Sequence, residues 1–297
     1  MTREEILRRL QGDLSLPAFP DVLARLDGLL ADSEVDVRDV ARLVQTDSVL
    51  AGQILRMANS AYYSRGGAQV ANAQAAVQRL GLKAVRGLVY ALTLPRLFQG
   101  GDFQYRALWK HSLAVAALSA ELVVFVGGGA AERDLAYLAG LLHDIGALVL
   151  ARIHDGYGAF LARCVELHDS SGWDERGISD LEREEMGIDH AEVGAVFLAE
   201  RWKTPHPVPL LVRHHHDLGW SDPAADAMLH RLMAILHVAN GVCGHVGMAW
   251  DNLPTEGRAF SESAWESLGL DLATVDALMA RMASSVEHAE TLLSAGG

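Results

Sequence analysis

The residues most able to do chemistry in this chain of 297 residues are its 13 histidines, none of which precedes His111. Histidine is the commonest metal ligand and a frequent general base. The most informative pair is His143-Asp144, within the apolar stretch Leu138–Gly146. A carboxylate in such surroundings is costly to bury unless it is paired or ligates an ion. The pair therefore indicates either a metal site or a hydrogen-bonded pair on the rim of a helix.

Further histidines lie in segments far apart in the sequence, each at a position that a helix could direct toward a shared site. They are His111, on an apolar helix, His190, at a helix start, His214-His215-His216, at a helix end, and His237 with Asn240, three residues apart on one face. Nitrogen and carboxylate ligands from several helices can build a mononuclear or dinuclear centre for a transition metal. Such a centre could activate water for attack on a phosphate ester.

The elements that must position these residues are predicted to be helices throughout. Apolar residues recur at helical spacing in both halves, and no alternating strand pattern of any length is present. In the second half, the strong helical segments span residues 108–126, 130–153, 189–203, 207–216, 224–243 and 272–293. Asp189, with Glu192 three residues later, has the spacing of a capping box at a helix start. We predict an all-α fold, a helical bundle of two subdomains.

The charge distribution separates the two halves. Residues 1–110 carry 14 basic and 11 acidic side chains, a net of +3, whereas residues 111–297 carry 11 and 27, a net of −16. The glycines near residue 100 indicate a boundary, so we expect subdomains over residues 1–105 and 106–297. The acidic balance argues against a general nucleic-acid binder. No apolar run reaches the length of a membrane span, and the two cysteines favour a cytoplasmic protein without disulfides.

Motifs in the first half resemble a known family. The motifs are Leu16-Pro17-Ala18-Phe19-Pro20, Asp47-Ser48-Val49-Leu50, Leu55-Arg56-Met57-Ala58-Asn59-Ser60-Ala61-Tyr62-Tyr63 and Ala75-Ala76-Val77-Gln78-Arg79-Leu80-Gly81. Together with the histidine order, they resemble the HDOD proteins, whose HD-related output domain belongs to the HD superfamily of metal-dependent phosphohydrolases and occurs in bacterial signalling. The resemblance covers roughly residues 14–245, with Ser48 in place of the usual proline. It implies an HD-like helical fold for the second subdomain.

The resemblance also implies a ligand set. His111, His143 and Asp144 correspond to the first ligands of the HD site, and His190, His215 and His216 to the additional histidines of relatives that hydrolyse cyclic di-GMP. Asn240 stands where the superfamily has its closing aspartate, and the Gly-Tyr-Pro signature of those relatives is missing after His216. Asparagine offers a neutral carbonyl oxygen instead of a charged ligand, which weakens the hold on a divalent ion.

We therefore expect a bacterial regulatory protein that acts by binding a ligand or partner, without hydrolase turnover. The expected partners are signalling proteins or a small nucleotide-type ligand, with no membrane and no nucleic acid. The expected cofactor is either a divalent Fe, Mn, Zn or Ni ion or none. The alternative is a phosphohydrolase acting on a nucleotide or cyclic dinucleotide, with Asp144 as its catalytic carboxylate.

Two weaker signals remain open. The acidic run over residues 180–185 is typical of solvated surface but could add a carboxylate to the site. Arg79, Lys83 and Arg86 form a basic stripe at helical spacing, which could contact an anionic partner or DNA.

Overall fold

The computed structural model describes residues 1–13, 15–64, 66–98, 105–171, 177–217, 219–222, 225–251, 262–270 and 274. Within these ranges, the secondary structure is helical and contains no β-strand, which confirms the predicted all-α fold. The chain divides into two compact units, of which one is built on Ala18–Gln99 and the other combines Met1–Pro17 with Gly100–Val286. Of the predicted helix over residues 272–293, all but residue 274 lies outside the described residues.

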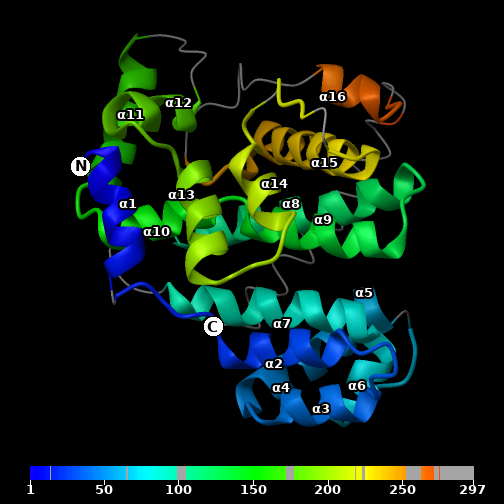
Figure 1. Ribbon diagram of the computed structural model, residues 1–297. Coiled ribbons are helices and arrows are strands. Elements are labelled where there is room, and N and C mark those ends of the chain that lie inside the picture. Colours follow the sequence, from blue (N-terminus) through cyan, green and yellow to red (C-terminus); the bar gives the residue numbers. More distant parts are fainter. Residues whose placement is uncertain are drawn as a thin grey trace. The chain divides into compact units, whose positions relative to one another are not determined.

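The smaller unit consists mostly of short helices (Figure 1), among which aliphatic side chains such as Leu23, Val40 and Ile54 are fully buried. Its helices are α2 (Asp21–Leu30), α3 (Val37–Gln45), α4 (Ser48–Ala58), α5 (Ala61–Ser64), α6 (Ala73–Leu80) and α7 (Leu82–Leu97). Three of them begin at residues whose side chains accept a backbone N–H, namely Asp36, Asp47 and Asn72. Such caps satisfy amides that the first helical turn leaves without partners, so they fix where these helices start.

Asn59, in the Ala-Asn-Ser motif, holds the connection between α4 and α6. Its side-chain Nδ2 donates to the Val70 carbonyl at 2.9 Å, and its Oδ1 accepts the Val70 N–H at 2.9 Å. The Ser60 hydroxyl donates to the Met57 carbonyl at 2.7 Å and closes the end of α4. These side chains satisfy backbone groups at a helix end. A structural role is therefore sufficient to explain the Ala-Asn-Ser motif.

The basic stripe does not form a common face. Gly81, with φ of +80°, separates α6 from α7, so Arg79 and Arg86 lie on different helices. Arg79 donates to the Ala58 carbonyl at 3.3 Å, and the Nε of Arg86 lies 2.7 Å from Oδ1 of Asp27. Both guanidinium groups are thus engaged within the unit, which removes much of the support for an anion-binding role.

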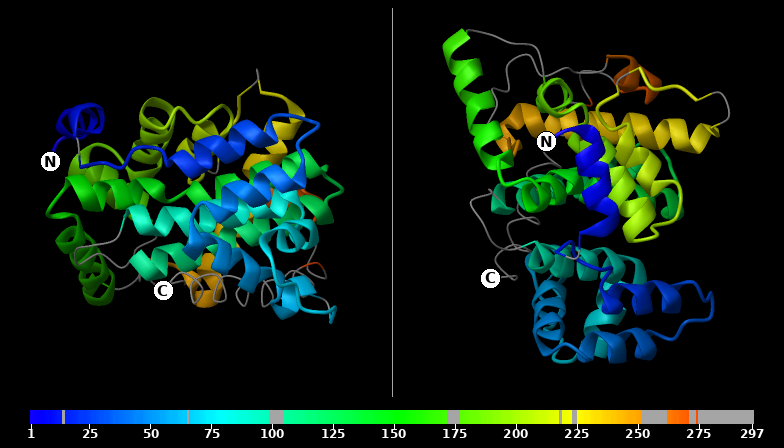
Figure 2. Two further views of the ribbon diagram at one scale, coloured as in Figure 1. Left: turned by 90° about the horizontal axis from the view of Figure 1, so that it is seen from below. Right: turned by 60° about the vertical axis from the view of Figure 1, so that its left-hand side comes forward.

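The larger unit carries every histidine named above as a candidate ligand. Its helices are α1 (Arg3–Gly12), α8 (Tyr105–Phe125), α9 (Ala130–Leu142), α10 (Ile145–Ile153), α11 (Tyr157–Ser171), α12 (Ile178–Met186), α13 (His190–Val196), the π-helical η1 (Phe197–Arg201), α14 (Val208–Arg213), α15 (Ala227–Cys243), the π-helical η2 (Gly244–Met248) and α16 (Glu262–Ser267). Helix α8 packs against α9 and α15, and α13 packs against α10 and α14 (Figures 1 and 2). These contacts bring segments that are distant in the sequence to one centre.

The amino-terminal helix α1 belongs to this larger unit, although the sequence grouped residues 1–105 together. Arg3 forms an ion pair of 2.6 Å with Glu192 on α13, and the Arg9 guanidinium donates to the Ile153 carbonyl at the end of α10. Both contacts are polar and join residues far apart in the sequence, so no local pattern predicts them.

Two stretches of this unit, Tyr105–Phe125 and Ala130–Ile153, are long and apolar enough to cross a membrane by length and composition. Their apolar windows are 72% and 78% buried inside the structure. Leu118 and Leu122 of α8, for example, pack in a cluster with Leu232 and Ile235 of α15. Protein therefore covers most of these stretches, as expected for core helices.

Candidate metal centre

The centre is organised around the junction between α9 and α10. The sequence predicted one helix over residues 130–153, whereas the structure divides it at His143-Asp144. His143 keeps helical angles, but Asp144 has φ of −98° and ψ of 11°, outside the helical range. Neighbouring side chains on a continuous helix point about 100° apart. The break instead lets Nε2 of His143 lie 2.9 Å from Oδ2 of Asp144.

A close helix crossing brings His190 to the same carboxylate. Helices α10 and α13 meet at Gly146 and Gly194, and a Cβ added to Gly146 would lie 1.8 Å from the His190 carbonyl oxygen. Only glycine permits this approach of two backbones. At the start of α13, capped by Asp189, Nε2 of His190 lies 3.2 Å from Oδ1 of Asp144.

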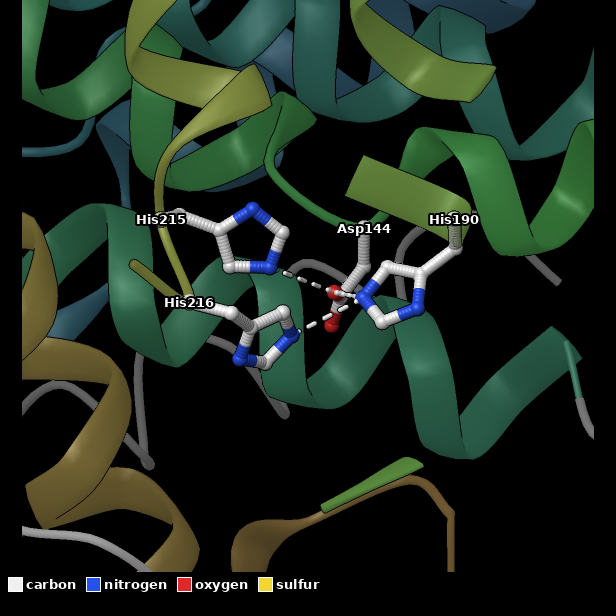
Figure 3. A group of neighbouring side chains, drawn as sticks. All are labelled: Asp144, His190, His215 and His216. Atoms are coloured by element: carbon white, nitrogen blue, oxygen red, sulfur yellow. Dashed lines mark hydrogen bonds and ion pairs between the residues drawn. The ribbon is translucent and has the colours of Figure 1, made fainter. Parts of the chain in front are cut away.

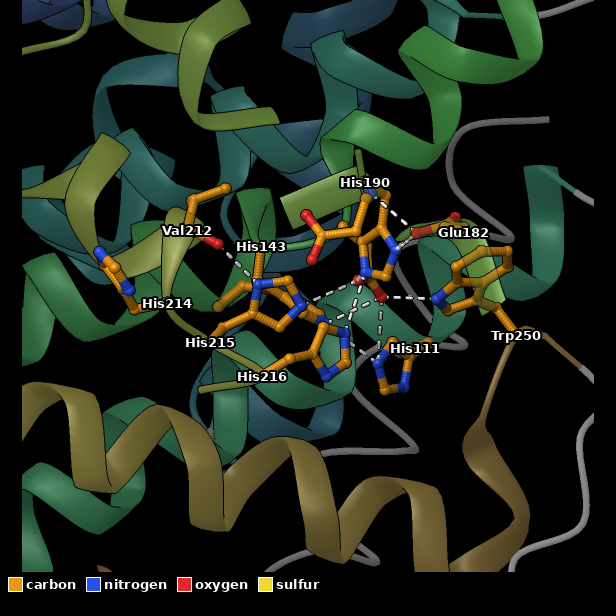
Figure 4. A network of polar contacts seen from close by, with 12 residues as sticks. His111, His143, Glu182, His190, Val212, His214, His215, His216 and Trp250 are labelled. Atoms are coloured by element: carbon orange, nitrogen blue, oxygen red, sulfur yellow. Dashed lines mark hydrogen bonds and ion pairs between the residues drawn. The ribbon is translucent and has the colours of Figure 1, made fainter. Parts of the chain in front are cut away.

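The remaining histidines come from α8 and from the turn after α14. Nε2 of His111 lies 3.4 Å from Oδ2 of Asp144, and Nε2 of His215 lies 3.4 Å from Oδ1 (Figures 3 and 4). Nε2 of His216 lies 3.0 Å from Nε2 of His190. Asp144 and all of these histidines except His216 are at most 3% exposed, and His216 is partly buried. The structure thus brings together six of the seven predicted ligands.

Hydrogen bonds on the far side of four imidazole rings orient them toward Asp144. In three rings, Nδ1 contacts a backbone carbonyl oxygen: that of His143 contacts Gly140 at 2.7 Å, that of His215 contacts Val212 at 2.7 Å, and that of His111 contacts Met248 at 3.0 Å. In the fourth ring, Nδ1 of His190 contacts a carboxylate oxygen of Glu182 at 2.6 Å. Carbonyl and carboxylate oxygens only accept hydrogen bonds, so Nδ1 of each ring carries the hydrogen. In each neutral ring, the Nε2 lone pair is therefore directed at the centre.

These lone pairs face one another, which is unfavourable unless a cation or a proton lies between them. Nε2 of His111 is 3.1 Å from Nε2 of His143, and Nε2 of His215 has no hydrogen-bond partner among the described residues. For metal–nitrogen bonds of about 2.0–2.1 Å, neighbouring ligand atoms of one ion are about 2.9–3.4 Å apart. The spacings around Asp144 lie in this range, so the residues fit a divalent transition-metal ion.

The electrostatics favour an ionised Asp144 and neutral rings at His215 and His216, but they favour the charged form of His190. Burial opposes the charge of Asp144, but the neighbouring His143 and the close contacts of His190 and His215 hold the pKa of Asp144 well below its usual range. Burial lowers the pKa of His215 to about 4 and that of His216 well below its ordinary value. Burial also opposes charge on His190, but Glu182 and Asp144 outweigh it and raise the pKa of His190.

Three further side chains support the centre. Glu182 of α12 is fully buried, accepts from both the backbone N–H and the ring of His190, and receives the hydroxyl of Tyr157. The Trp250 indole N–H donates to Oδ2 of Asp144 at 2.6 Å. Glu182 belongs to the acidic run at 180–185, where the sequence left a role in the site open. Tyr157 and Trp250 were missed, since neither lies in a motif.

Three other polar residues named from the sequence lie outside these contacts. Asn240 is half-buried in the last turn of α15, where its carbonyl accepts the Gly244 N–H. No contact recorded for the described residues joins the Asn240 amide to the cluster. His214 lies near Asp217, with Nδ1 3.6 Å from its carboxylate, and Nε2 of His237 donates to the His214 carbonyl. Of the three consecutive histidines, only the second and third therefore face Asp144.

Comparison with known proteins relates this chain to a family. The HDOD domain pattern matches residues 16–218. An uncharacterized protein of Treponema pallidum (strain Nichols) is 28% identical over 205 residues, which span 68% of this chain but only 38% of that relative.

Three solved structures extend the likeness to most of the chain. An HDOD domain protein of unknown function from Geobacter sulfurreducens is 24% identical with a TM-score of 0.74, covering 96% of this chain and 98% of its own. A candidate signal transduction protein of Marinobacter aquaeolei VT8 is 25% identical with a TM-score of 0.73, covering 97% and 64%. A candidate phosphohydrolase of Shewanella amazonensis SB2B is 25% identical with a TM-score of 0.69, covering 97% of both chains.

Proposed function

Because this chain belongs to the HDOD domain family, we propose that it is a signal-transduction module whose larger unit holds a divalent transition-metal ion. The observation that carries the proposal is the convergence of buried Nε2 lone pairs on Asp144, each directed there by a hydrogen bond on Nδ1. Residues His111, His143, Asp144, His190, His215 and His216 are the ligands available to it. Nitrogen-rich sets of this kind suit Zn, Fe, Mn or Ni.

An ion at this position would join segments that the chain otherwise connects only through packing. The ligands come from α8, the α9–α10 junction, α13 and the turn after α14. Since the free energy of metal binding adds to the stability of the state that binds, ion binding would favour one arrangement of these four segments. Such coupling suits a regulatory module that responds to a signalling protein or a nucleotide-type ligand.

Burial favours this regulatory role over catalytic turnover. A catalytic metal site keeps a coordination position open to substrate, whereas Asp144 is 2% exposed and His143 and His190 are fully buried. The Trp250 indole, itself 5% exposed, lies directly on the carboxylate. The indole therefore covers Oδ2, and a phosphate ester that approached from this side would have to displace it.

The second candidate is a metal-dependent phosphohydrolase. It is favoured by the ligand chemistry and by the similarity to the candidate phosphohydrolase of Shewanella amazonensis. A bound divalent ion would supply a Lewis acid and a water of lowered pKa. The residues of this chain would contribute the neutral imidazoles and the Asp144 carboxylate that hold the ion.

Metal analysis and calorimetry test the proposal. We expect the purified protein to contain a divalent ion, and the metal-free protein to bind Zn²⁺ or Mn²⁺. The matched pair is His215→Gln and His214→Gln, since these neighbours differ in facing the cluster. The first variant should lose at least about tenfold in affinity, and the second should match the unmodified protein. Equal affinities for the two variants, or no metal binding at all, would reject the proposal.

A phosphodiesterase assay on the metal-loaded protein separates the two candidates. The regulatory role predicts no hydrolysis of bis-p-nitrophenyl phosphate or of cyclic dinucleotides. Hydrolysis that disappears in Asp144→Asn would instead establish the phosphohydrolase.

A further inference from the structure

The carboxylate of Asp144 has two sides, and each oxygen faces a different pair of histidines. Oδ1 lies 3.2 Å from Nε2 of His190 and 3.4 Å from Nε2 of His215. Oδ2 lies 2.9 Å from Nε2 of His143 and 3.4 Å from Nε2 of His111. The centre therefore contains two ligand groups that share one side chain, and the question is whether both can hold an ion.

Trp250 makes the Oδ2 side different from the Oδ1 side. Its indole N–H donates to Oδ2 at 2.6 Å, and its ring stands nearly perpendicular to that of His190, with centroids 6.0 Å apart (Figure 4). An indole nitrogen is a donor only and does not ionise at physiological pH. A cation therefore cannot displace this hydrogen as it displaces a titratable proton. To bind the lone pair of Oδ2 that accepts the indole hydrogen, a cation must move the tryptophan. Trp250 is 5% exposed, so it has little room to move.

The same segment also holds His111. The Met248 carbonyl accepts Nδ1–H of His111 at 3.0 Å, two residues before Trp250. Oδ2 of Asp144 and the ring of His111 are thus both hydrogen-bonded to one short stretch after α15, over residues 248–250. On this side a cation would have two imidazole nitrogens and one oxygen that already accepts a strong hydrogen bond.

The Oδ1 side offers a fuller set of ligands. Its nitrogens are Nε2 of His190, His215 and His216, and one ligand atom from each of these and from Asp144 lies within 4.8 Å of every other (Figure 3). Three nitrogens and one oxygen are a complete tetrahedral set. Any hydrogen at these nitrogens is a titratable proton that an incoming metal displaces. No comparable exchange is open to the indole hydrogen on Oδ2.

We propose that the chain binds a single divalent ion, held by His190, His215, His216 and Oδ1 of Asp144, and that Trp250 sets this stoichiometry by keeping Oδ2 hydrogen-bonded. This inference rests on the proposed metal-binding function, but it can fail while that function stands. It assigns to Trp250 a role in selecting between the two ligand groups.

The test is a metal titration of the metal-free protein with Co²⁺, followed by calorimetry and by the visible absorption of the bound ion. The unmodified protein should take up one equivalent. Trp250→Phe should take up a second, with affinity at least about tenfold above any second site of the unmodified protein, because Oδ2 loses a charge-assisted hydrogen bond. The matched control is Trp202→Phe, since the Trp202 indole donates to the Pro17 carbonyl instead; it should take up one equivalent.

Each outcome decides the inference. Two equivalents of similar affinity in the unmodified protein, or one equivalent in a folded Trp250→Phe, would overturn it while leaving metal binding intact. No uptake of Co²⁺, Zn²⁺ or Mn²⁺ by any variant would overturn the proposed function as well.

A second variant pair keeps the inference testable if Trp250→Phe does not fold. His216→Gln removes a ligand from the Oδ1 group, and His111→Gln removes one from the Oδ2 group. The first substitution should lower the affinity for the first ion at least about tenfold more than the second does. The reverse order would place the ion on the Oδ2 side and reject the inference.

Discussion

Glu182 binds His190 twice: one carboxylate oxygen accepts the backbone N–H at 2.8 Å and Nδ1–H of the ring at 2.6 Å. Both side chains are fully buried, and the Tyr157 hydroxyl holds the second oxygen. A carboxylate behind an imidazole fixes the tautomer and raises the basicity of the other nitrogen. Glu182 thus orients the ring of His190 as backbone carbonyls orient the rings of His111, His143 and His215. In this case the acceptor is a carboxylate instead of a carbonyl.

Removing the charge of Glu182 should weaken metal binding without unfolding the unit. Glu182→Gln keeps the shape and an oxygen for His190 but lacks the charge, so we expect affinity for Zn²⁺ to fall about tenfold. Calorimetry on the metal-free protein measures the change. The control is Glu185→Gln on the same helix, whose carboxylate is half exposed and pairs with Arg163. An equal loss in both variants would show that the effect is not specific to His190.

Gly146→Ala should disrupt the crossing of α10 and α13. The added Cβ would lie 1.8 Å from the His190 carbonyl oxygen and 2.6 Å from the Gly194 nitrogen, so one backbone must move. We expect a loss of about 3 kcal/mol in stability, seen as a lower Tm, together with weaker metal binding. Gly158→Ala in α11 is the control, because no atom lies within 4 Å of its added Cβ. An unchanged Tm in Gly146→Ala would contradict the observed crossing.

Asn59→Ala should loosen the smaller unit and leave the metal centre intact. The substitution removes both hydrogen bonds to Val70, for which we expect a cost of about 1–3 kcal/mol. Amide hydrogen exchange should increase at residues 66–71, the part of the connection that the two Asn59 hydrogen bonds hold in place. Metal content measured on the same sample should match that of the unmodified protein. Unchanged exchange in this connection would show that Asn59 does not hold it.

Stability should also fall in alkaline solution because of Cys243. Burial raises the pKa of this thiol from 9.0 to about 12. Between these values the unfolded chain loses the proton while the folded chain retains it, so the contribution is fully present below pH 9 and is lost as the pH rises toward 12. Urea unfolding at pH 8 and pH 10 measures the difference, which should be smaller in Cys243→Ala. A thiol that reacts rapidly with iodoacetamide in the folded protein would contradict this burial.

Much of the centre was predictable from residue types and helical patterns. Helices determine where His111 and His190 lie, and the histidines after α14 follow from the end of that helix. The break at His143-Asp144 was not predictable, because apolar residues continue on both sides and mimic one long helix. The role of Gly146 depends on a partner backbone about 50 residues later in the chain, so no local signal reveals it.

The residues around the ligands were less accessible to prediction. Glu182 stands in a run of acidic residues that resembles solvated surface, but the structure buries it where α12 packs against α13 and where Tyr157 of α11 contacts it. Trp250 follows a π-helical turn after α15, and its hydrogen bond to Asp144 spans 106 residues. Sequence patterns describe which face of an element is buried, but they do not identify which distant group will meet it.

Trp250 lies beyond residue 218, where the match to the family ends, whereas all six proposed ligands lie before it. A fragment cut at the family boundary would therefore retain every ligand yet lack both the indole on Asp144 and the Met248 carbonyl behind His111. Metal binding measured on such a fragment would describe the ligands alone and would not represent the intact protein. In this chain, the matched domain provides the six candidate ligands, and the sequence that follows it supplies the groups that contact Asp144 and His111 from outside that domain.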